Sequence, residues 1–273
     1  MIRHYMGWIA VFLLVLLSCA AIFGPSLIVH DFNTQNISER LQNPSFSHLF
    51  GTDELGRDIL VRILFGARIS IGIGVLTALL SLTLGTFIGA VAGYYGKWSD
   101  LVLLKVADVV STVPAILVAT LLTLVFGRTF IGILISISSF AWILQMRIVR
   151  AQVHVIKNEP YIEAARALGA GDLRILISHI LPQLQGTLII SLGVLIPTNI
   201  LTESFLSFLG IGLQPPLASW GSLAYEGFRA FSSYPHLAVY PGVTLFLSLL
   251  AMNIVADWLH WRLGKQNGEV PHF

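Results

Sequence analysis

Residues 159–183 read EPYIEAARALGAGDLRILISHILPQ. This stretch holds acidic residues, arginines and a histidine, whereas the whole chain of 273 residues is 55% hydrophobic and only 11% charged. Soluble domains are about one quarter charged, so a mean hydropathy of +0.81 indicates a different class of protein. The stretch is a charged interruption in an apolar chain, and the segments around it predict the fold.

The apolar segments predict an all-α integral membrane protein. Several of them reach the ~20 apolar residues that a helix needs to cross a hydrocarbon core of ~30 Å. They are apolar on every side, whereas the strands of a membrane barrel alternate apolar and polar residues. The net charge of +2 comes without a basic arm, so we expect no nucleic-acid partner.

Six membrane spans are expected, near residues 8–29, 69–93, 101–126, 131–150, 184–206 and 238–259. Cys19 in the first span is the only cysteine, so the chain has no disulfide framework. The LLSCAA sequence around it loosely resembles a cleaved signal peptide or a lipoprotein signal. The apolar run continues past this cysteine, which favours a first membrane helix.

Lysine and arginine gather in the cytoplasmic loops of membrane proteins. If the N-terminus is cytoplasmic, every lysine falls on the cytoplasmic side. Both termini and the loop 151–183 are then cytoplasmic, and the long segments 30–68 and 207–237 face out. We divide the chain into residues 1–68 (the first helix and an external segment), a membrane domain at 69–260 and a cytoplasmic tail at 261–273.

Small residues and prolines mark particular spans. Gly85, Gly89 and Gly93 form a row with four-residue spacing, which lets two membrane helices approach closely. Pro114 and Pro197 lie inside the third and fifth spans, where a proline removes a backbone hydrogen bond and kinks the helix. Polar neighbours accompany them, Ser111 and Thr112 at the first, Thr198 and Asn199 at the second. Such helices suit the lining of a pathway and suit plain packing equally.

Asp108 is a carboxylate inside the third span, where charge is costly and is usually functional or paired. Lys105 lies three residues earlier on the same helical face. We expect a structural ion pair between them, and a functional role for Asp108 is the alternative.

Motifs for covalent or metal chemistry are absent from the sequence. There is no phosphate-binding G-x-x-x-x-G-K-[ST], no H-E-x-x-H and no G-x-S-x-G. The eight histidines are scattered without a second ligand at metal spacing. We therefore expect no catalytic site, no metal site and no cofactor bound by this chain.

The opening stretch predicts two short helices joined at a glycine. Pro160 suits a first helical position, Glu159 can cap, and Glu163 falls in the first turn. Gly169 follows as a C-terminal glycine. Asp172 can cap a second helix, which ends before Pro182. A helix of about nine residues does not persist alone in water, so it docks against a partner surface or lies as an amphipathic hairpin on the membrane.

The same stretch resembles the EAA motif in permease subunits of bacterial ABC importers. The matching positions are Glu163, Ala164, Ala165, Gly169, Leu181 and Pro182. His179 followed by Ile180 is an arrangement of the peptide and nickel branch of that family. Segments 49–74, 93–100 and 207–221 resemble the second, or C-type, permease of this branch, and the resemblance runs from about residue 45 to 260. Ala256-Asp257 departs from the Gly-Asp that is usual there.

The resemblance implies a type I ABC importer transmembrane domain at 69–260 and a coupling helix that sits in a cleft of a separate ATPase. It implies a second related permease, two ABC ATPase subunits that bind the ATP, and an external solute-binding protein, in a bacterial inner membrane. Peptides are the branch's commonest cargo, with nickel, glutathione and other small solutes as alternatives. The rivals are an ion-gradient-driven secondary transporter, disfavoured by the lack of repeats and of midmembrane charges, and a scaffold that transports nothing.

Overall fold

The computed structural model describes residues 2–27 and 32–266, which are helical with no β-strand among them. The all-α fold expected from the sequence is confirmed. The elements in chain order, with η1 a 3-10 turn and η2 a π turn, are α1 (Ile2–Leu27), η1 (Ile37–Glu39), α2 (Ile59–Tyr95), α3 (Lys97–Thr112), α4 (Ala115–Phe126), α5 (Phe130–Ile156), α6 (Pro160–Ala167), α7 (Asp172–Ile175), η2 (Leu176–Ile180), α8 (Leu181–Gln183), α9 (Gln185–Phe208), α10 (Trp220–Arg229) and α11 (His236–Gln266).

Five of the described helices are long and apolar enough to cross a membrane, and a sixth span exists if the bent pair α3–α4 is counted as one. The five are α1, α2, α5, α9 and α11. These positions match the six expected spans, although residues 28 and 29 of the first expected span lie outside the described residues. The chain is therefore a multi-pass membrane protein.

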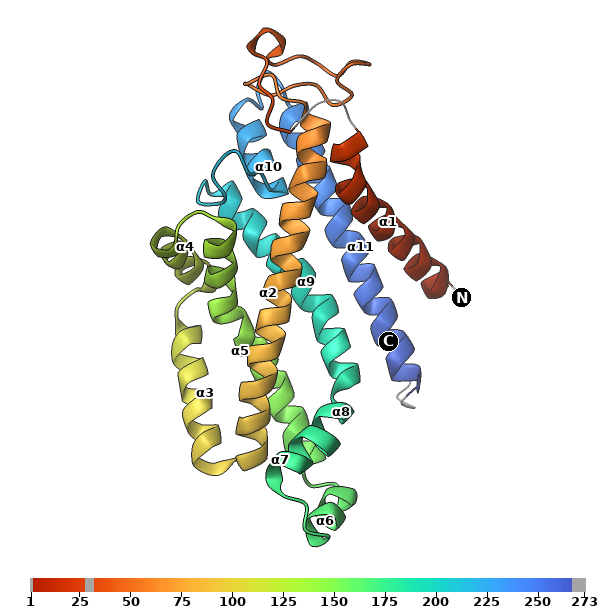
Figure 1. The fold of residues 1–273 in the computed structure, drawn as a ribbon, viewed down its shortest axis with the longest axis vertical. Coiled ribbons are helices and arrows are strands. Elements are labelled where there is room, and N and C mark those ends of the chain that lie inside the picture. The colour runs from red at the N-terminus through yellow and green to blue at the C-terminus, as the bar shows by residue number, and fades with distance from the viewer. Residues whose placement is uncertain (1, 28–31, 267–273) are drawn as a thin grey trace.

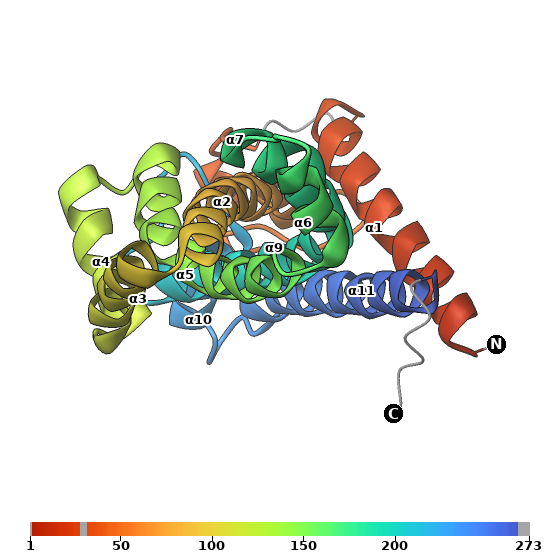
Figure 2. The ribbon, with the colours of Figure 1, turned by 90° about the horizontal axis from the view of Figure 1, so that it is seen from below.

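The elements form an elongated bundle (Figure 1). The segment between α1 and α2 covers one end, together with α10, and the α6–α7 loop projects from the other. Seen from below in Figure 2, α1 and α11 lie on one flank while α3 and α4 lie on the opposite flank. The loop thus sits beneath the central helices α2, α5 and α9.

Helix α2 begins ten residues before the expected span, at Ile59 rather than near residue 69. Asp58 starts it, because its carboxylate accepts a hydrogen bond from the backbone N–H of Val61 at 3.0 Å. His48 contacts the other carboxylate oxygen of Asp58 at 2.8 Å. Residues 58–68, which were expected to belong to the external segment, are thus a buried cap and the first turns of α2.

The glycine row on α2 is confirmed as a packing surface against α5. A Cβ at position 85 would lie 2.6 Å from the carbonyl oxygen of Trp142. The corresponding distances are 2.5 Å at position 89, to Met146, and 2.7 Å at position 93, to Arg150. Backbone approaches backbone along several turns, and only glycine leaves the space for it.

Pro114 does more than kink the third span. Helix α3 ends at Thr112, α4 begins at Ala115, and their axes differ by 85°. The residue before a proline is disfavoured in helical conformation, and Val113 is extended with ψ 132°. Pro197 behaves differently, because α9 continues through it.

Buried charges fasten the segment between α1 and α2 to the bundle. Arg62, 1% exposed, donates to the Asp53 carboxylate at 2.7 Å and to the Glu226 carboxylate at 2.6 Å. Arg57 donates to Asp53 at 2.6 Å. Glu226 belongs to α10, a helix within the long segment 207–237. Ser219 starts this helix through a reciprocal capping box with Ser222.

Candidate functional site

The opening stretch forms α6 and α7 at the end of the bundle opposite the segment between α1 and α2. Pro160 occupies the first turn of α6, as expected. Glu159 is the N-cap residue, but its side chain makes no capping hydrogen bond, so the predicted side-chain cap is wrong. Its backbone carbonyl accepts from Ile162 instead, at 2.9 Å. Glutamate is not among the residues preferred for capping, which are serine, threonine, aspartate and asparagine.

Gly169 ends α6 in the left-handed conformation, with φ +88°. The backbone N–H of Gly169 donates to the carbonyl of Arg166, and that of Ala170 donates to Ala165, each at 3.0 Å. These two bonds are the Schellman arrangement that closes many helices. The predicted reversal of the chain at this glycine is confirmed.

The sequence suggested that Asp172 caps the second helix, and the structure shows otherwise. Gly171 is the N-cap of α7, and Asp172 is its first residue. Its carboxylate instead accepts a hydrogen bond from the Tyr94 hydroxyl of α2 at 2.7 Å. Hydrogen bonding to the same hydroxyl raises the pKa of the Arg166 guanidinium. Asp172 therefore links the loop to α2.

The second helix does not stop before Pro182. Regular α-helix ends at Ile175, a π turn follows at Leu176–Ile180, and α8 includes Pro182. Proline cannot donate a backbone hydrogen bond. A π turn shifts the hydrogen-bond register just before the missing donor, which lets the chain stay helical into α9.

One face of the loop is anchored and the other is free. Ile162 on α6 is fully buried in a cluster that also contains Ile175, Ile180 and residues of α2 and α5. The opposite face exposes Glu163, Ala164 and Leu168, the last with 89% of its surface accessible. Helix α6 is thus anchored by the side chain of Ile162, and its exposed face carries Glu163, Ala164 and Leu168.

The loop is also joined to the ends of the long helices. Lys157, at the end of α5, donates to the carbonyl of Gly93 at 2.7 Å and to that of Tyr94 at 3.2 Å. These are terminal carbonyls of α2, where a cation is favoured. Arg150 of α5 forms a bidentate pair with Asp100 of α3, with one bond at 2.6 Å. These contacts join the end of α5, where the loop begins, to α2 and α3.

The residues predicted to line a pathway do not share one surface. Pro114 and Thr198 are exposed, whereas Pro197 and Asn199 are buried inside the bundle. The Thr198 hydroxyl donates to the carbonyl of Val194 one turn earlier. Their role in a pathway stays a prediction.

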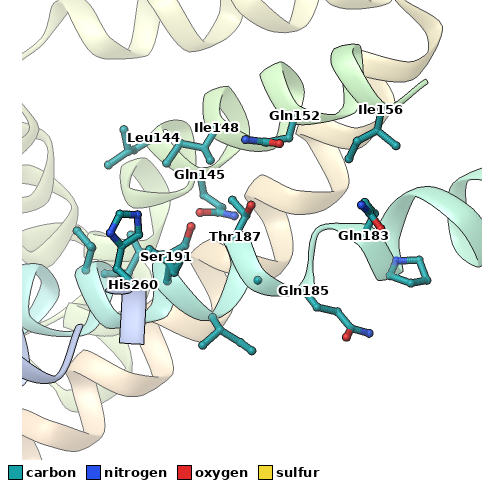
Figure 3. Close-up of a pocket in the computed structure, with 16 residues that line it drawn as sticks. Leu144, Gln145, Ile148, Gln152, Ile156, Gln183, Gln185, Thr187, Ser191 and His260 are labelled. Atoms are coloured by element: carbon teal, nitrogen blue, oxygen red, sulfur yellow. The ribbon is translucent and has the colours of Figure 1, made fainter. Parts of the chain in front are cut away.

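A cavity of about 940 Å³ opens beside the loop, between α5, the α8–α9 segment and α11 (Figure 3). Its polar lining includes Gln145, Gln152, Gln183, Gln185, Thr187, Ser191 and His260. Sequence reasoning missed this site. The available signals were the seven-residue spacing of Gln145 and Gln152 and the four-residue spacing of Thr187 and Ser191, each of which places two polar residues on one helical face.

Asp108 pairs with a partner other than the one expected. Its carboxylate accepts from Arg147 of α5 at 3.0 Å, and no ion pair with Lys105 forms within the described residues. Helix α3 packs along α5, so a longer side chain from the neighbouring helix reaches the acid. The described residues also contain no cluster of His, Cys, Asp and Glu that could hold a metal ion.

Comparison with known proteins agrees with this architecture. The family model described as "Binding-protein-dependent transport system inner membrane component" matches residues 85–266. The oligopeptide transport system permease protein OppC of Bacillus subtilis is 39% identical over 254 residues, 93% of this chain and 83% of that protein. The dipeptide transport system permease protein DppC of the same organism is 36% identical, over 94% of this chain and 81% of that protein. The glutathione transport system permease protein GsiD of Pectobacterium atrosepticum is 35% identical, over 94% of this chain and 86% of that protein.

The family model covers the glycine row of α2, the α6–α7 loop and the cavity lining, and the relatives extend the similarity over nearly the whole chain. The chain therefore belongs to the family of inner-membrane permease components of binding-protein-dependent transport systems.

Proposed function

We propose that this chain is one of two related permease subunits in an ATP-driven bacterial importer, and that its cargo is di- or oligopeptides. Three relatives with similar coverage carry names for oligopeptide, dipeptide and glutathione transport, and glutathione is itself a small peptide. Nickel or another small solute is the alternative cargo. The chain carries out no covalent chemistry, and ATP is bound by partner ATPase subunits.

The anchored loop is the observation that carries this function. Helix α6 is fixed by Ile162 and turned by Gly169, and its exposed face of Glu163, Ala164 and Leu168 suits the cleft of an ATPase. The Asp172–Tyr94 bond and the Lys157 contacts join it to α2. When two ATPases close on ATP, a push on α6 reaches α2 and α5 and shifts the bundle between inward- and outward-facing states.

The proposed orientation places α6 and both termini in the cytoplasm, and the segment between α1 and α2 with α10 outside, where a solute-binding protein delivers cargo. Positively charged residues near the loop support this orientation. Arg166 belongs to α6 and Arg174 to α7, Lys157 is the C-cap of α5, and Arg150 lies in the last turns of α5.

The experiment is uptake of a labelled tripeptide by proteoliposomes that hold this chain with its second permease, its ATPases and its binding protein. We expect uptake that needs ATP and stops with vanadate, without sensitivity to an uncoupler. Glu163→Lys should abolish uptake and the stimulation of ATP hydrolysis, because a reversed charge in a fitted interface costs several kcal/mol. Glu163→Gln, which keeps the size, should retain most of it.

Uptake that survives vanadate and stops with an uncoupler would replace this proposal with a secondary transporter. Normal uptake by the Glu163→Lys complex would remove the assignment of α6 as the coupling element. Both complexes should still assemble in the membrane, since position 163 lies outside every candidate span.

A further inference from the structure

Gln145 of α5 is an amide without a partner. It is 1% exposed, and neither its side-chain oxygen nor its nitrogen has a hydrogen-bond partner. Leaving such a group unsatisfied costs about 1–3 kcal/mol per atom, and most buried side-chain polar atoms are paired. Other buried side chains also lack partners, but Gln145 lines a cavity, where a ligand can supply the missing bonds.

The side chain lies at the floor of the cavity described above. In Figure 3 it points from α5 toward Thr187 and Ser191 of α9. Ser191 is 7% and Leu195 5% exposed, so this end is enclosed. Gln152 and Gln183 are exposed at the rim, beside the loop. Glutamine amide groups thus lie both at the open rim, from Gln152 and Gln183, and at the enclosed floor, from Gln145.

The cavity wall carries hydrogen-bonding groups without fixed charge. Among the described residues that line it there is no aspartate, glutamate, lysine or arginine. A glutamine both donates through its NH₂ and accepts through its carbonyl. A peptide bond presents a C=O acceptor and an N–H donor that match these two groups, whatever side chains flank it. The volume of about 940 Å³ is within the range of small-molecule sites.

We propose that this cavity binds the backbone amides of the transported peptide, with Gln145 as the innermost contact and Gln152 at the entrance to the cytoplasm. The inference rests on the proposed peptide cargo. Neutral amides hold a peptide weakly and without regard to its sequence, as a transport path requires, because solute must enter and also leave. A fixed charge at the wall would favour the passage of peptides of opposite charge and repel those of the same charge.

The absence of charge gives the sharpest test. Gln152→Glu and Gln152→Lys place opposite charges at an exposed rim position, where neither charge is buried. The readout is uptake of a basic and an acidic tripeptide by the full reconstituted complex, each divided by the ATP hydrolysed. We expect the basic-to-acidic ratio to rise about 25-fold with glutamate and to fall about 25-fold with lysine. A unit charge about 4 Å away in water is worth about 1 kcal/mol, a factor of about five, and it acts in opposite directions on the two peptides.

Two further variants complete the design. Lys97→Glu changes charge at the same end of the molecule, at an exposed residue outside the cavity, and should leave the ratio at the parent value. Gln145→Leu keeps a side chain of comparable bulk and removes both hydrogen-bonding atoms. It should lower peptide uptake per ATP about tenfold, while the basic-to-acidic ratio stays constant.

The outcomes separate the inference from the function on which it rests. If the parent complex takes up no peptide, the proposed cargo and the inference both fail. If the parent takes up peptides but the two Gln152 variants share one ratio, the cavity is not the peptide path and only the inference fails. Opposite shifts with Glu and Lys support it even where the Gln145→Leu protein does not assemble. An assembled Gln145→Leu complex with parental uptake per ATP overturns the role of Gln145.

Discussion

Gly169 shows how much one residue decides in the α6–α7 loop. Its positive φ of +88° is left-handed backbone, which costs other residues roughly 1–2 kcal/mol. A Cβ at this position would meet no atom within 4 Å. Substitution therefore acts through backbone strain alone, and the direction in which the chain leaves α6 is what changes.

A graded series at this position follows from that strain. Asparagine tolerates the left-handed region, alanine does so less well, and a β-branched valine least. We expect stimulation of ATP hydrolysis by the loaded binding protein to stay near the parent value in Gly169→Asn, to fall in Gly169→Ala and to be lost in Gly169→Val. Equal activity in all three would mean that the turn at 169 does not position α6.

The sequence predicted most of this loop at the residue level, and two of its errors, at Asp172 and Asp108, have a common cause. Pro160 and Gly169 act through their own backbones, so their positions could be read directly from the sequence. Glu159 and Asp172 were assigned as caps because each precedes a helical run. Asp172 binds Tyr94, a residue 78 positions earlier, and Asp108 likewise pairs with Arg147 of another helix. Side-chain partners from distant segments cannot be identified from local spacing.

At the scale of the element, the α2–α5 pair is the most extensive helix contact in the bundle. It depends on the absence of side chains at Gly85, Gly89 and Gly93, where backbone atoms of α5 occupy the space. Because carbonyl oxygens of α5 are among the obstructing atoms at all three positions, side-chain movement alone does not make room, and the helix axes must separate to admit a methyl group. Overpacking of this kind typically costs about 1–3 kcal/mol.

Gly89→Ala should therefore lower the thermal stability of the complex purified in detergent, measured as its Tm. Gly72→Ala provides the matched control on the same helix, because a Cβ at position 72 would lie 3.6 Å from the Phe130 ring, an ordinary contact. We expect the Tm of Gly72→Ala to stay at the parent value. A Gly89→Ala complex as stable as that control would mean that α2 and α5 adjust freely.

Sequence patterns located the helices better than their ends and breaks. The apolar runs gave the positions of the spans, since their length follows from the thickness of the membrane. Helix α2 begins earlier than expected because its first turns carry charged residues that the fold buries with partners, among them Arg62. The cavity was not predicted at all, because Gln145 and Ser191 become neighbours only when α5 and α9 pack.

At the scale of the whole molecule, orientation in the membrane is the property to test. Asp53 and Glu226 both contact Arg62 at one end, and Gly169 lies at the other. With single cysteines in a Cys19→Ser background, we expect an impermeant thiol reagent on intact cells to label position 226, which is partly exposed, and to leave position 169 unlabelled. Labelling of 169 alone would invert the orientation, and with it the assignment of α6 to the cytoplasm.

The charge network of the outer end also orders events during synthesis of the chain. Glu226 follows Arg62 by 164 residues, whereas Asp53 precedes it by nine. At ~5–20 residues per second, the ribosome needs on the order of ten seconds to supply the distant acid. Asp53 is thus the first counter-ion that the chain supplies to Arg62, and the network is complete only after α10 has been made.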